Sequence, residues 1–536
     1  METRTESIDS MVRTVERQLT KVISRNENST LNQDNLVVST THGPVRGRQV
    51  AKVVAWRGIP YAAPPTGTRR FQRPREPERW TEILDASAHG ASPIQPKVPA
   101  MLGGAGSGPL DEDSLTINVV RPATQWSTLR PVMVWIYGGA FSYGASTAYD
   151  GAELAVEGGV LVVTFNYRVG AFGFLDFTEY STPAQSFDTN NGLRDQVAAL
   201  KWVRNNISSF GGDPDNVTLF GESAGGISVT TLMCVPEAHG LFHRAIAQSS
   251  APSTVFRRER TQEWAKQFVG FLGDTSAPVT ARLIEATSAE ILAATGKLTD
   301  LAPKEQPGTL SVAPTVDGDF LPIRPLEAFR DGSAARIPLI IGNNATEGRF
   351  FQLLARVQKK EALPTSKDSI EKMFALTDSH AQNRVLAAYP DYPSRASTAQ
   401  IAGDIVFWYP STVVADAHSR YAPTWVYRFD FASPIRRLLR LGATHAAEID
   451  YVFGKVATRT GIKRILGGGT AATALSIRMM RTWLAFAISG GPGHEWPRYD
   501  TVSRPTLIFD RNLRVENDPR GTQRTAWDTY KNWDDK

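Results

Sequence analysis

The stretch that decides the fold is Val217-Thr218-Leu219-Phe220-Gly221-Glu222-Ser223-Ala224-Gly225-Gly226. An apolar run leads into Gly-x-Ser-x-Gly and then into a helical pattern, an order typical of a strand, a sharp turn and a helix. The two glycines keep side chains out of the crowded turn, and the positive end of the following helix favours negative charge on the serine. The stretch predicts that Ser223 is a nucleophile. The alternative for the pentapeptide alone is a Gly/Ser turn without chemistry.

The apolar run that leads into this motif and further runs on both sides of it predict a sheet. They are apolar on consecutive positions, as in strands buried on both faces of a mostly parallel sheet. The runs are Leu115–Val120, Val132–Tyr137, Val160–Asn166, Val217–Phe220, Leu339–Gly342, Trp425–Phe429 and Thr506–Phe509. Helical patterns alternate with them, which indicates an α/β protein with helices on both faces of a large central sheet. The polar stretches 255–335 and 350–420 are expected to be helical insertions over one end of the sheet, and a hairpin is expected to turn at residues 42–44.

Composition is typical of a soluble globular protein. The 536 residues are 41% apolar and 21% charged, which excludes wholesale disorder and fibrous structure. The net charge is only 59 − 54 = +5, without a dense basic patch, so we expect no nucleic-acid partner. No run reaches 18 apolar residues, so no transmembrane segment is predicted. The single cysteine, Cys234, excludes an intrachain disulfide and a thiolate metal site.

The first 35 residues differ from the rest of the chain. Apolar residues at helical spacing predict an amphipathic helix, and residues 26–35 are a polar linker, so we divide the chain into 1–35 and an enzyme domain at 36–536. The helix either docks on the protein's own surface or serves as a dimerising or membrane-surface helix, which makes a homo-oligomer one possibility. The segment lacks the apolar core of a secretory signal, and four acidic residues by position 16 argue against an organelle transit peptide, so we expect a cytoplasmic protein.

A serine nucleophile needs a base, and the base needs an orienting acid. With the chain order Ser, acid, His, four histidines lie far enough downstream: His380, His418, His445 and His494. His380 and His418 fall in polar helical stretches, where a solvated histidine is the simpler interpretation, and His494 lies in a Gly/Pro loop. His445 follows the strand Trp425–Phe429 by a loop, as a catalytic histidine at the end of a sheet should.

The acid is expected at the end of an earlier strand. Glu347 lies in the loop after the apolar run 337–342, and it is our candidate. Its competitors, Asp317 and Asp319, are better interpreted as turn residues. The alternative for Glu347 is a carboxylate at the N-terminus of a helix.

The reaction also needs donors for the oxyanion of its intermediate. Tyr137-Gly138-Gly139-Ala140-Phe141 follows the run Val132–Ile136, and its small residues would let backbone N–H groups approach a reacting carbonyl. The N–H of Ala224, directly after the nucleophile, would supply a further donor.

These motifs together resemble the type-B carboxylesterase family, which has the α/β-hydrolase fold. Further landmarks lie at 57–62, 112–119, 135–141, 191–196 and 210–214, and the resemblance covers most of residues 37–510. It implies that Ser223 is the nucleophile, Glu347 in Thr-Glu-Gly the acid, and His445 in Thr-His-x-x-Glu the base. It also implies that Gly139, Ala140 and Ala224 donate to the oxyanion.

The chain departs from the family pattern in two places of chemical interest. Secreted members pair two cysteines at positions that here are Ser114 and Pro93, so both halves of that bridge are missing, which suits a reducing compartment. The last small residue of the oxyanion loop is Ala140 where many members have glycine, a variant that resembles bacterial members.

The resemblance implies a carboxylesterase that hydrolyses small-molecule esters through an acyl-enzyme, without a metal or organic cofactor. The same triad would serve a carbamate, amide or thioester hydrolase, and the sequence does not separate these. A non-catalytic binding module of the same fold is the alternative from another class.

Overall fold

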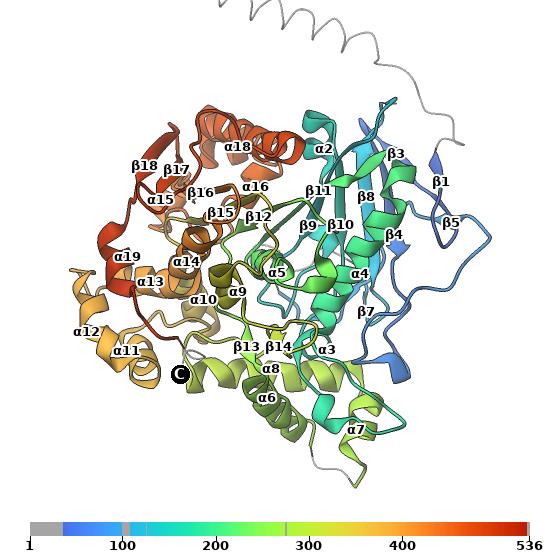
Figure 1. Ribbon diagram of the computed structural model, residues 1–536, viewed down its shortest axis with the longest axis horizontal. Helices are drawn as coiled ribbons and strands as arrows, with labels where there is room; N and C mark the ends of the chain where they lie inside the picture. Colours follow the sequence, from blue (N-terminus) through green and yellow to red (C-terminus); the bar gives the residue numbers. More distant parts are fainter. Residues whose placement is uncertain (1–35, 99–107, 125, 274–275, 533–536) are drawn as a thin grey trace, which may run out of the picture.

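The computed structural model describes residues 36–98, 108–124, 126–273 and 276–532 (Figure 1). A sheet of 11 strands runs through this part of the chain in the order β18-β17-β16-β15-β12-β11-β9-β10-β8-β4-β3. Pairings from β10 to β17 are parallel, and those at the two ends are antiparallel. The strands are β3 (Arg48–Val50), β4 (Val53–Pro60), β8 (Thr116–Pro122), β9 (Arg130–Ile136), β10 (Leu161–Phe165), β11 (Gly212–Glu222), β12 (Arg244–Gln248), β15 (Leu339–Asn344), β16 (Thr424–Phe429), β17 (Pro505–Phe509) and β18 (Arg514–Asn517).

Helices cover both faces of this sheet, as side chains of β16 show. Trp425 and Tyr427 pack on Phe486 and Trp483 of α18, whereas Val426 and Arg428 line a cavity together with α14. Neighbouring residues of a strand point to opposite faces. Helices α4, α5 and α14 therefore lie on one face, and α2, α16 and α18 on the other (Figure 1). Their bounds are α2 (Ala152–Gly158), α4 (Asn191–Asn206), α5 (Ala224–Leu232), α14 (Tyr409–His418), α16 (Ile449–Val452) and α18 (Gly469–Ser489).

The two polar stretches form helical insertions, as predicted. In Figure 1 they gather away from α2 and α18. The first holds α6 (Arg258–Phe271), α7 (Val279–Glu285), α8 (Ser288–Glu305) and α9 (Pro325–Asp331), and the second holds α10 (Gly348–Gln358), α11 (Lys367–Leu376), α12 (Ser379–Ala387) and α13 (Arg395–Gly403). A π-helical turn, Asp404–Trp408, joins α13 to α14. Because α10 starts beyond the carboxyl end of β15 and packs against α13, the second insertion lies over that end of the sheet.

Smaller elements complete the fold. The predicted hairpin forms between β1 (Val37–Ser39) and β2 (Pro44–Arg46), and β5 (Leu84–Asp85) extends it. The remaining elements are β6 (Ser92–Pro93), β7 (Leu110–Asp111), α3 (Ala171–Phe174), β13 (Phe256–Arg257), β14 (Thr315–Val316), α15 (Pro434–Leu438), α17 (Gly461–Leu466) and α19 (Gly521–Trp527), besides short 3-10 turns.

The structure confirms the predicted strands and corrects one prediction of exposure. Each predicted run lies within or overlaps a strand of the large sheet. His418, however, is buried and lies within hydrogen-bonding distance of the Ile337 carbonyl, 2.8 Å away, because α14 packs against the interior strands β15 and β16 of the sheet. The predicted helix in residues 1–35 lies outside the described residues, so it remains a prediction.

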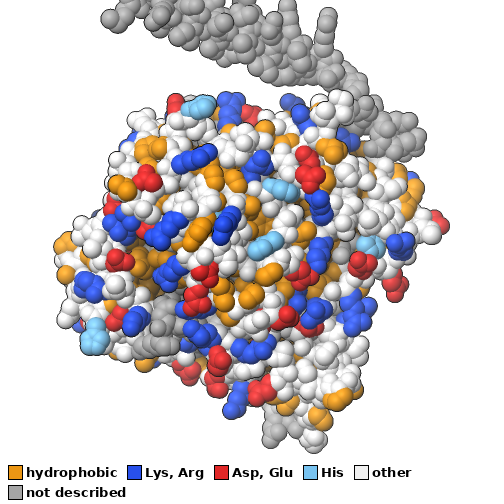
Figure 2. Space-filling model, in the orientation of Figure 1, with side chains coloured by type: hydrophobic (Ala, Val, Ile, Leu, Met, Phe, Trp, Pro, Cys, Tyr) orange, Lys and Arg blue, Asp and Glu red, His pale blue; other side chains and the backbone are white. Residues whose placement is uncertain are grey.

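The length and hydropathy of the helices in the described part of the chain decide whether any could span a membrane. None of the helices placed there is long and apolar enough to cross a bilayer. Figure 2 shows basic and acidic side chains interspersed across the face drawn, in line with the small net charge.

Candidate active site

Ser223 lies where β11 turns into α5, as the motif predicted. Its backbone has φ 57° and ψ −122°, a strained conformation for a residue other than glycine. A Cβ on Gly225 would lie 2.0 Å from the Ile136 carbonyl oxygen, and one on Gly221 would lie 2.6 Å from Gly225. The Ser223 N–H donates to the Gln248 carbonyl at 3.0 Å, and Ile227 N–H donates to Ser223 O at 2.8 Å. The turn thus requires glycine at both flanking positions and holds the serine backbone fixed.

The loop after β9 approaches this serine closely. A Cβ on Gly138 would lie 3.0 Å from the Ser223 Cβ, and one on Gly139 would lie 2.1 Å from the Tyr143 carbonyl oxygen. Gly139 and Ala140 have φ 119° and 51°. Within the described part of the chain, the N–H groups of Gly139, Ala140 and Ala224 have no hydrogen-bond acceptor. Unpaired donors beside a strained serine are the arrangement that an oxyanion requires.

His445 and Glu347 form a buried pair at 2.7 Å between Nδ1 and Oε2. The other oxygen of Glu347 accepts hydrogen bonds from Ser249 Oγ at 2.6 Å and from the Asn344 N–H at 2.7 Å. These donors fix the carboxylate, and the carboxylate fixes the ring through Nδ1. His445 Nε2 is thereby left to face the other way.

Nε2 of His445 faces the nucleophile turn, where it meets Glu222 first. The distance to Glu222 Oε1 is 3.3 Å, and Glu222 directly precedes Ser223. The Ser223 hydroxyl makes no hydrogen bond to any residue that the structure describes. The structure therefore joins Glu347 to His445 and brings His445 to the residue beside Ser223, without a bond between the imidazole and the serine hydroxyl.

A third buried carboxylate, Glu448, lies near His445 besides Glu347 and Glu222. Gln248 Nε2 donates to it at 3.1 Å and Asn344 Nδ2 at 2.5 Å. The Gln248 amide is held in turn by Trp483 Nε1 at 3.0 Å. Our sequence analysis assigned no role to Glu222, Ser249, Asn344 or Glu448. The available signal was position: Glu222, Ser249 and Asn344 lie at or directly after the carboxyl ends of strands, and Glu448 is the glutamate of the Thr-His-x-x-Glu motif.

The charges of this cluster shift one another's proton affinity. Burial raises the pKa of Glu222 to about 8, although the neighbouring His445 lowers it. Burial lowers the pKa of His445, but the charges of Glu222 and Glu347 outweigh this and raise it to about 9. Burial also raises the pKa of Glu448. Glu222 and His445 therefore compete for one proton at mildly alkaline pH.

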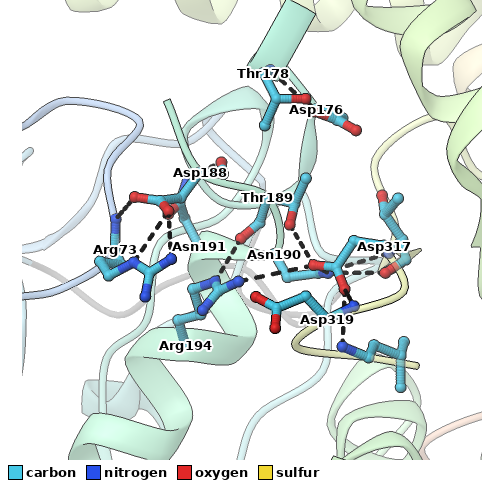
Figure 3. A network of polar contacts seen from close by, with 12 residues as sticks. Arg73, Asp176, Thr178, Asp188, Thr189, Asn190, Asn191, Arg194, Asp317 and Asp319 are labelled. Carbon is cyan, nitrogen blue, oxygen red and sulfur yellow. Dashed lines mark hydrogen bonds and ion pairs between the residues drawn. The ribbon is translucent and has the colours of Figure 1, made fainter. Parts of the chain in front are cut away.

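The competing acids and histidines occupy other places. Asp317 and Asp319 lie in a turn, as predicted: Asp317 Oδ1 accepts from the N–H groups of Asp319 at 3.1 Å and Leu321 at 2.9 Å. Figure 3 shows Asp317 in a network with Thr189, Asn190 and Arg194. His380 and His494 are exposed to solvent.

The two positions that correspond to the paired cysteines of secreted family members, Pro93 and Ser114, lie close to each other in this structure. Pro93 and Ser114 line one small cavity together. Cys234 is buried, its thiol lies 3.3 Å from the Thr230 carbonyl oxygen, and burial raises its pKa. In the part of the chain that the structure describes, no group of three or more His, Cys, Asp or Glu side chains is arranged to hold a metal ion.

Comparisons with known proteins identify the family of the chain. A model of the carboxylesterase family matches residues 34–527. The para-nitrobenzyl esterase of Bacillus subtilis (strain 168) is 39% identical over 499 residues, which cover 91% of this chain and 97% of that protein. Carboxylesterase 5A of Canis lupus familiaris is 34% identical over 524 residues, covering 90% of this chain and 87% of that protein.

Solved structures give the same result. A PNB esterase superposes with a TM-score of 0.79 and 37% identity, covering 92% of this chain and 99% of that chain. A carboxylesterase of Geobacillus stearothermophilus superposes with a TM-score of 0.78 and 34% identity, covering 92% of this chain and 100% of that chain. The chain thus has the α/β-hydrolase fold, with a strained serine after β11 and a buried His–Glu pair at the same end of the sheet. It is similar to carboxylesterases along nearly its whole length, and it belongs to the carboxylesterase family.

Proposed function

We propose that this carboxylesterase hydrolyses esters through a triad of Ser223, His445 and Glu347. The observation that carries the proposal is the pair between His445 Nδ1 and Glu347 Oε2 at 2.7 Å. It leaves Nε2 facing the turn that presents Ser223. A base held through one nitrogen and free at the other is what a serine nucleophile requires.

In this mechanism His445 takes the Ser223 proton, and the serine oxygen attacks the ester carbonyl. The N–H groups of Gly139, Ala140 and Ala224 stabilise the oxyanion, since they are free to donate. His445 then gives its proton to the departing alcohol, which leaves an acyl-enzyme on Ser223. The same imidazole activates a water molecule, and hydrolysis releases the acid and restores the serine. Glu347 stays ionised throughout and stabilises the imidazolium.

The same chemistry would open an amide, carbamate or thioester, and a fatty acyl-CoA hydrolase precursor of Anas platyrhynchos is 33% identical over 512 residues. We therefore propose small-molecule esters as the primary substrates. A panel of matched p-nitrophenyl esters, anilides, carbamates and acyl thioesters, compared by kcat/KM, decides among them. A cytoplasmic location and a homo-oligomer formed through residues 1–35 stay predictions.

The test is hydrolysis of p-nitrophenyl butyrate by the purified full-length chain beside Ser223→Ala. We expect the substitution to lower turnover by about 10⁶-fold, as in other serine hydrolases. Ser208→Ala is the matched control, because Ser208 is exposed and outside the site. A fluorophosphonate should add one covalent label, on Ser223. A residual rate of Ser223→Ala within tenfold of wild type would reject the nucleophile, and a folded wild-type protein inert on the whole panel would favour a binding module.

A further inference from the structure

Two short helices near the His445 loop present an apolar surface that nothing in the described structure covers. Neither α15 nor α17 has a buried residue. The exposed fractions of the large apolar side chains range from 43% for Leu466 to 78% for Leu438. We call the following residues the α15–α17 patch: Leu438, Leu439, Ile462, Ile465 and Leu466, with the basic residues Arg437, Arg440, Lys463 and Arg464.

Contacts at the base of the two helices place them beside each other. Directly before α15, Phe431 lies 3.0 Å from the position of a Cβ on Gly468, which follows α17. Burial lowers the pKa of Arg436 of α15, and the charge of Arg459, just before α17, lowers it slightly further. Arg436 Nη1 also donates to Thr444 Oγ1 at 2.6 Å, so the patch adjoins the loop that carries His445.

The patch is also strongly and uniformly basic. Residues 434–441 and 455–469 together contain seven Lys and Arg residues and no Asp or Glu. The charged groups of Arg437, Arg440, Lys463 and Arg464 form no ion pair with any described residue. An apolar surface ringed by free cations needs a partner that is apolar inside and negatively charged outside.

We propose that the α15–α17 patch docks on the surface of an anionic phospholipid membrane. The leucines and isoleucines would enter the boundary between headgroups and acyl chains, and the four cations would bind lipid phosphates. A second copy of the chain is a poorer occupant, because a twofold contact would bring the same basic residues against one another. The proposal concerns where the protein resides and does not depend on the catalytic triad.

The experiment is co-sedimentation of the full-length chain with vesicles of phosphatidylcholine containing about one third phosphatidylglycerol. We expect wild type to bind these vesicles and to bind pure phosphatidylcholine at least tenfold more weakly, since each basic residue at an anionic surface contributes roughly fivefold to partitioning. High salt should release the protein. An apolar variant (Leu438→Ser, Leu439→Ser, Ile462→Ser, Ile465→Ser) and a charge variant (Arg437→Glu, Arg440→Glu, Lys463→Glu, Arg464→Glu) should each lose at least tenfold in binding.

A matched control removes exposed apolar side chains elsewhere. Val357→Ser with Val502→Ser changes two of the most exposed ones, at 68% and 90%, and should bind like wild type. All variants keep residues 1–35 and should hydrolyse p-nitrophenyl butyrate like wild type, which shows that they are folded. The proposal fails if wild type does not bind anionic vesicles, if both patch variants bind as well as wild type, or if the apolar variant instead converts a dimer to a monomer.

Discussion

Two polar networks of this protein, one partly exposed and one buried, differ in how their charges are balanced. Around Asp317 and Asp188, carboxylates and guanidinium groups alternate, so that Arg73 pairs with Asp188 and Arg194 with Asp317 (Figure 3). Around His445, three buried carboxylates surround one imidazole. The first arrangement neutralises its charges and serves stability. The second leaves proton affinities shifted, which is the usual mark of a site that performs chemistry.

The largest effect in this comparison, after loss of the nucleophile, is expected from Glu347→Gln. The amide keeps the shape of the side chain, but it presents either an N–H donor or an uncharged oxygen to Nδ1. His445 therefore loses the carboxylate that orients its ring and stabilises the imidazolium. We expect kcat to fall by about 10⁴-fold with little change in folding. Steady-state kinetics with p-nitrophenyl butyrate measure the loss, and Asp319→Asn should leave the rate unchanged. A loss below tenfold would place the acid elsewhere.

Asp317→Ala should have the opposite effect, a large loss of stability with little loss of kcat. Removing this carboxylate leaves Arg194 buried without its partner and removes the acceptor of the Asp319 and Leu321 N–H groups. We expect the free energy of unfolding to fall by about 3–5 kcal/mol. At a temperature where the variant is folded, kcat should stay within a few-fold of wild type. Urea unfolding followed by fluorescence checks stability, and a selective loss of kcat would show that the two networks are not separate in function.

Gly139→Ala tests the unpaired donors beside Ser223. The added Cβ would meet the Tyr143 carbonyl oxygen at 2.1 Å, so the loop must shift and carry its N–H groups away from the oxyanion. We expect kcat to fall by about 10²–10³-fold. Gly240→Ala is the control, because Gly240 also has positive φ but no atom lies within 4 Å of its added Cβ. Equal losses in both variants would mean that backbone strain alone is responsible.

The smallest effect is expected from Glu222→Gln, and it is an effect on pH dependence. A negative charge 3.3 Å from Nε2 stabilises the imidazolium and raises the pKa of His445. Removing that charge lowers this pKa, so the acidic limb of the kcat/KM profile should move to lower pH. A shift of roughly one pH unit corresponds to about 1.4 kcal/mol of charge interaction. A shift toward higher pH would contradict the arrangement described.

The sequence predicted the parts of the fold and site that depend on local pattern. The runs at 132–137 and 217–220 are apolar or β-branched at every position because the sheet buries both their faces, and Gly221 and Gly225 indicate a turn too tight for a side chain. His445 and Glu347 were predicted from their place after strands and from the resemblance, and the structure brings them to 2.7 Å from each other.

The supporting residues escaped prediction because their partners are distant in sequence. Ser249 and Glu347 are 98 positions apart, and Gln248 and Glu448 are 200 positions apart. Parallel neighbours β12 and β15 bring the first pair together. The prediction for His418 was wrong for the same reason, since the polar sequence around it gave no sign that α14 packs against β15 and β16. Local polarity thus describes solvent exposure poorly where an insertion returns to the core.

The order of the strands also determines when, during synthesis, the site is complete. Ser223 follows β11, but Glu347 and His445 come after β15 and β16, which join the sheet later along the chain. His445 is 445 − 223 = 222 residues beyond the serine. At a translation rate of about 5–20 residues per second, the ribosome needs about 11–44 seconds to make that stretch. The nascent chain thus contains its serine turn well before it contains the proposed base, and every fragment ending before His445 should be inert toward esters.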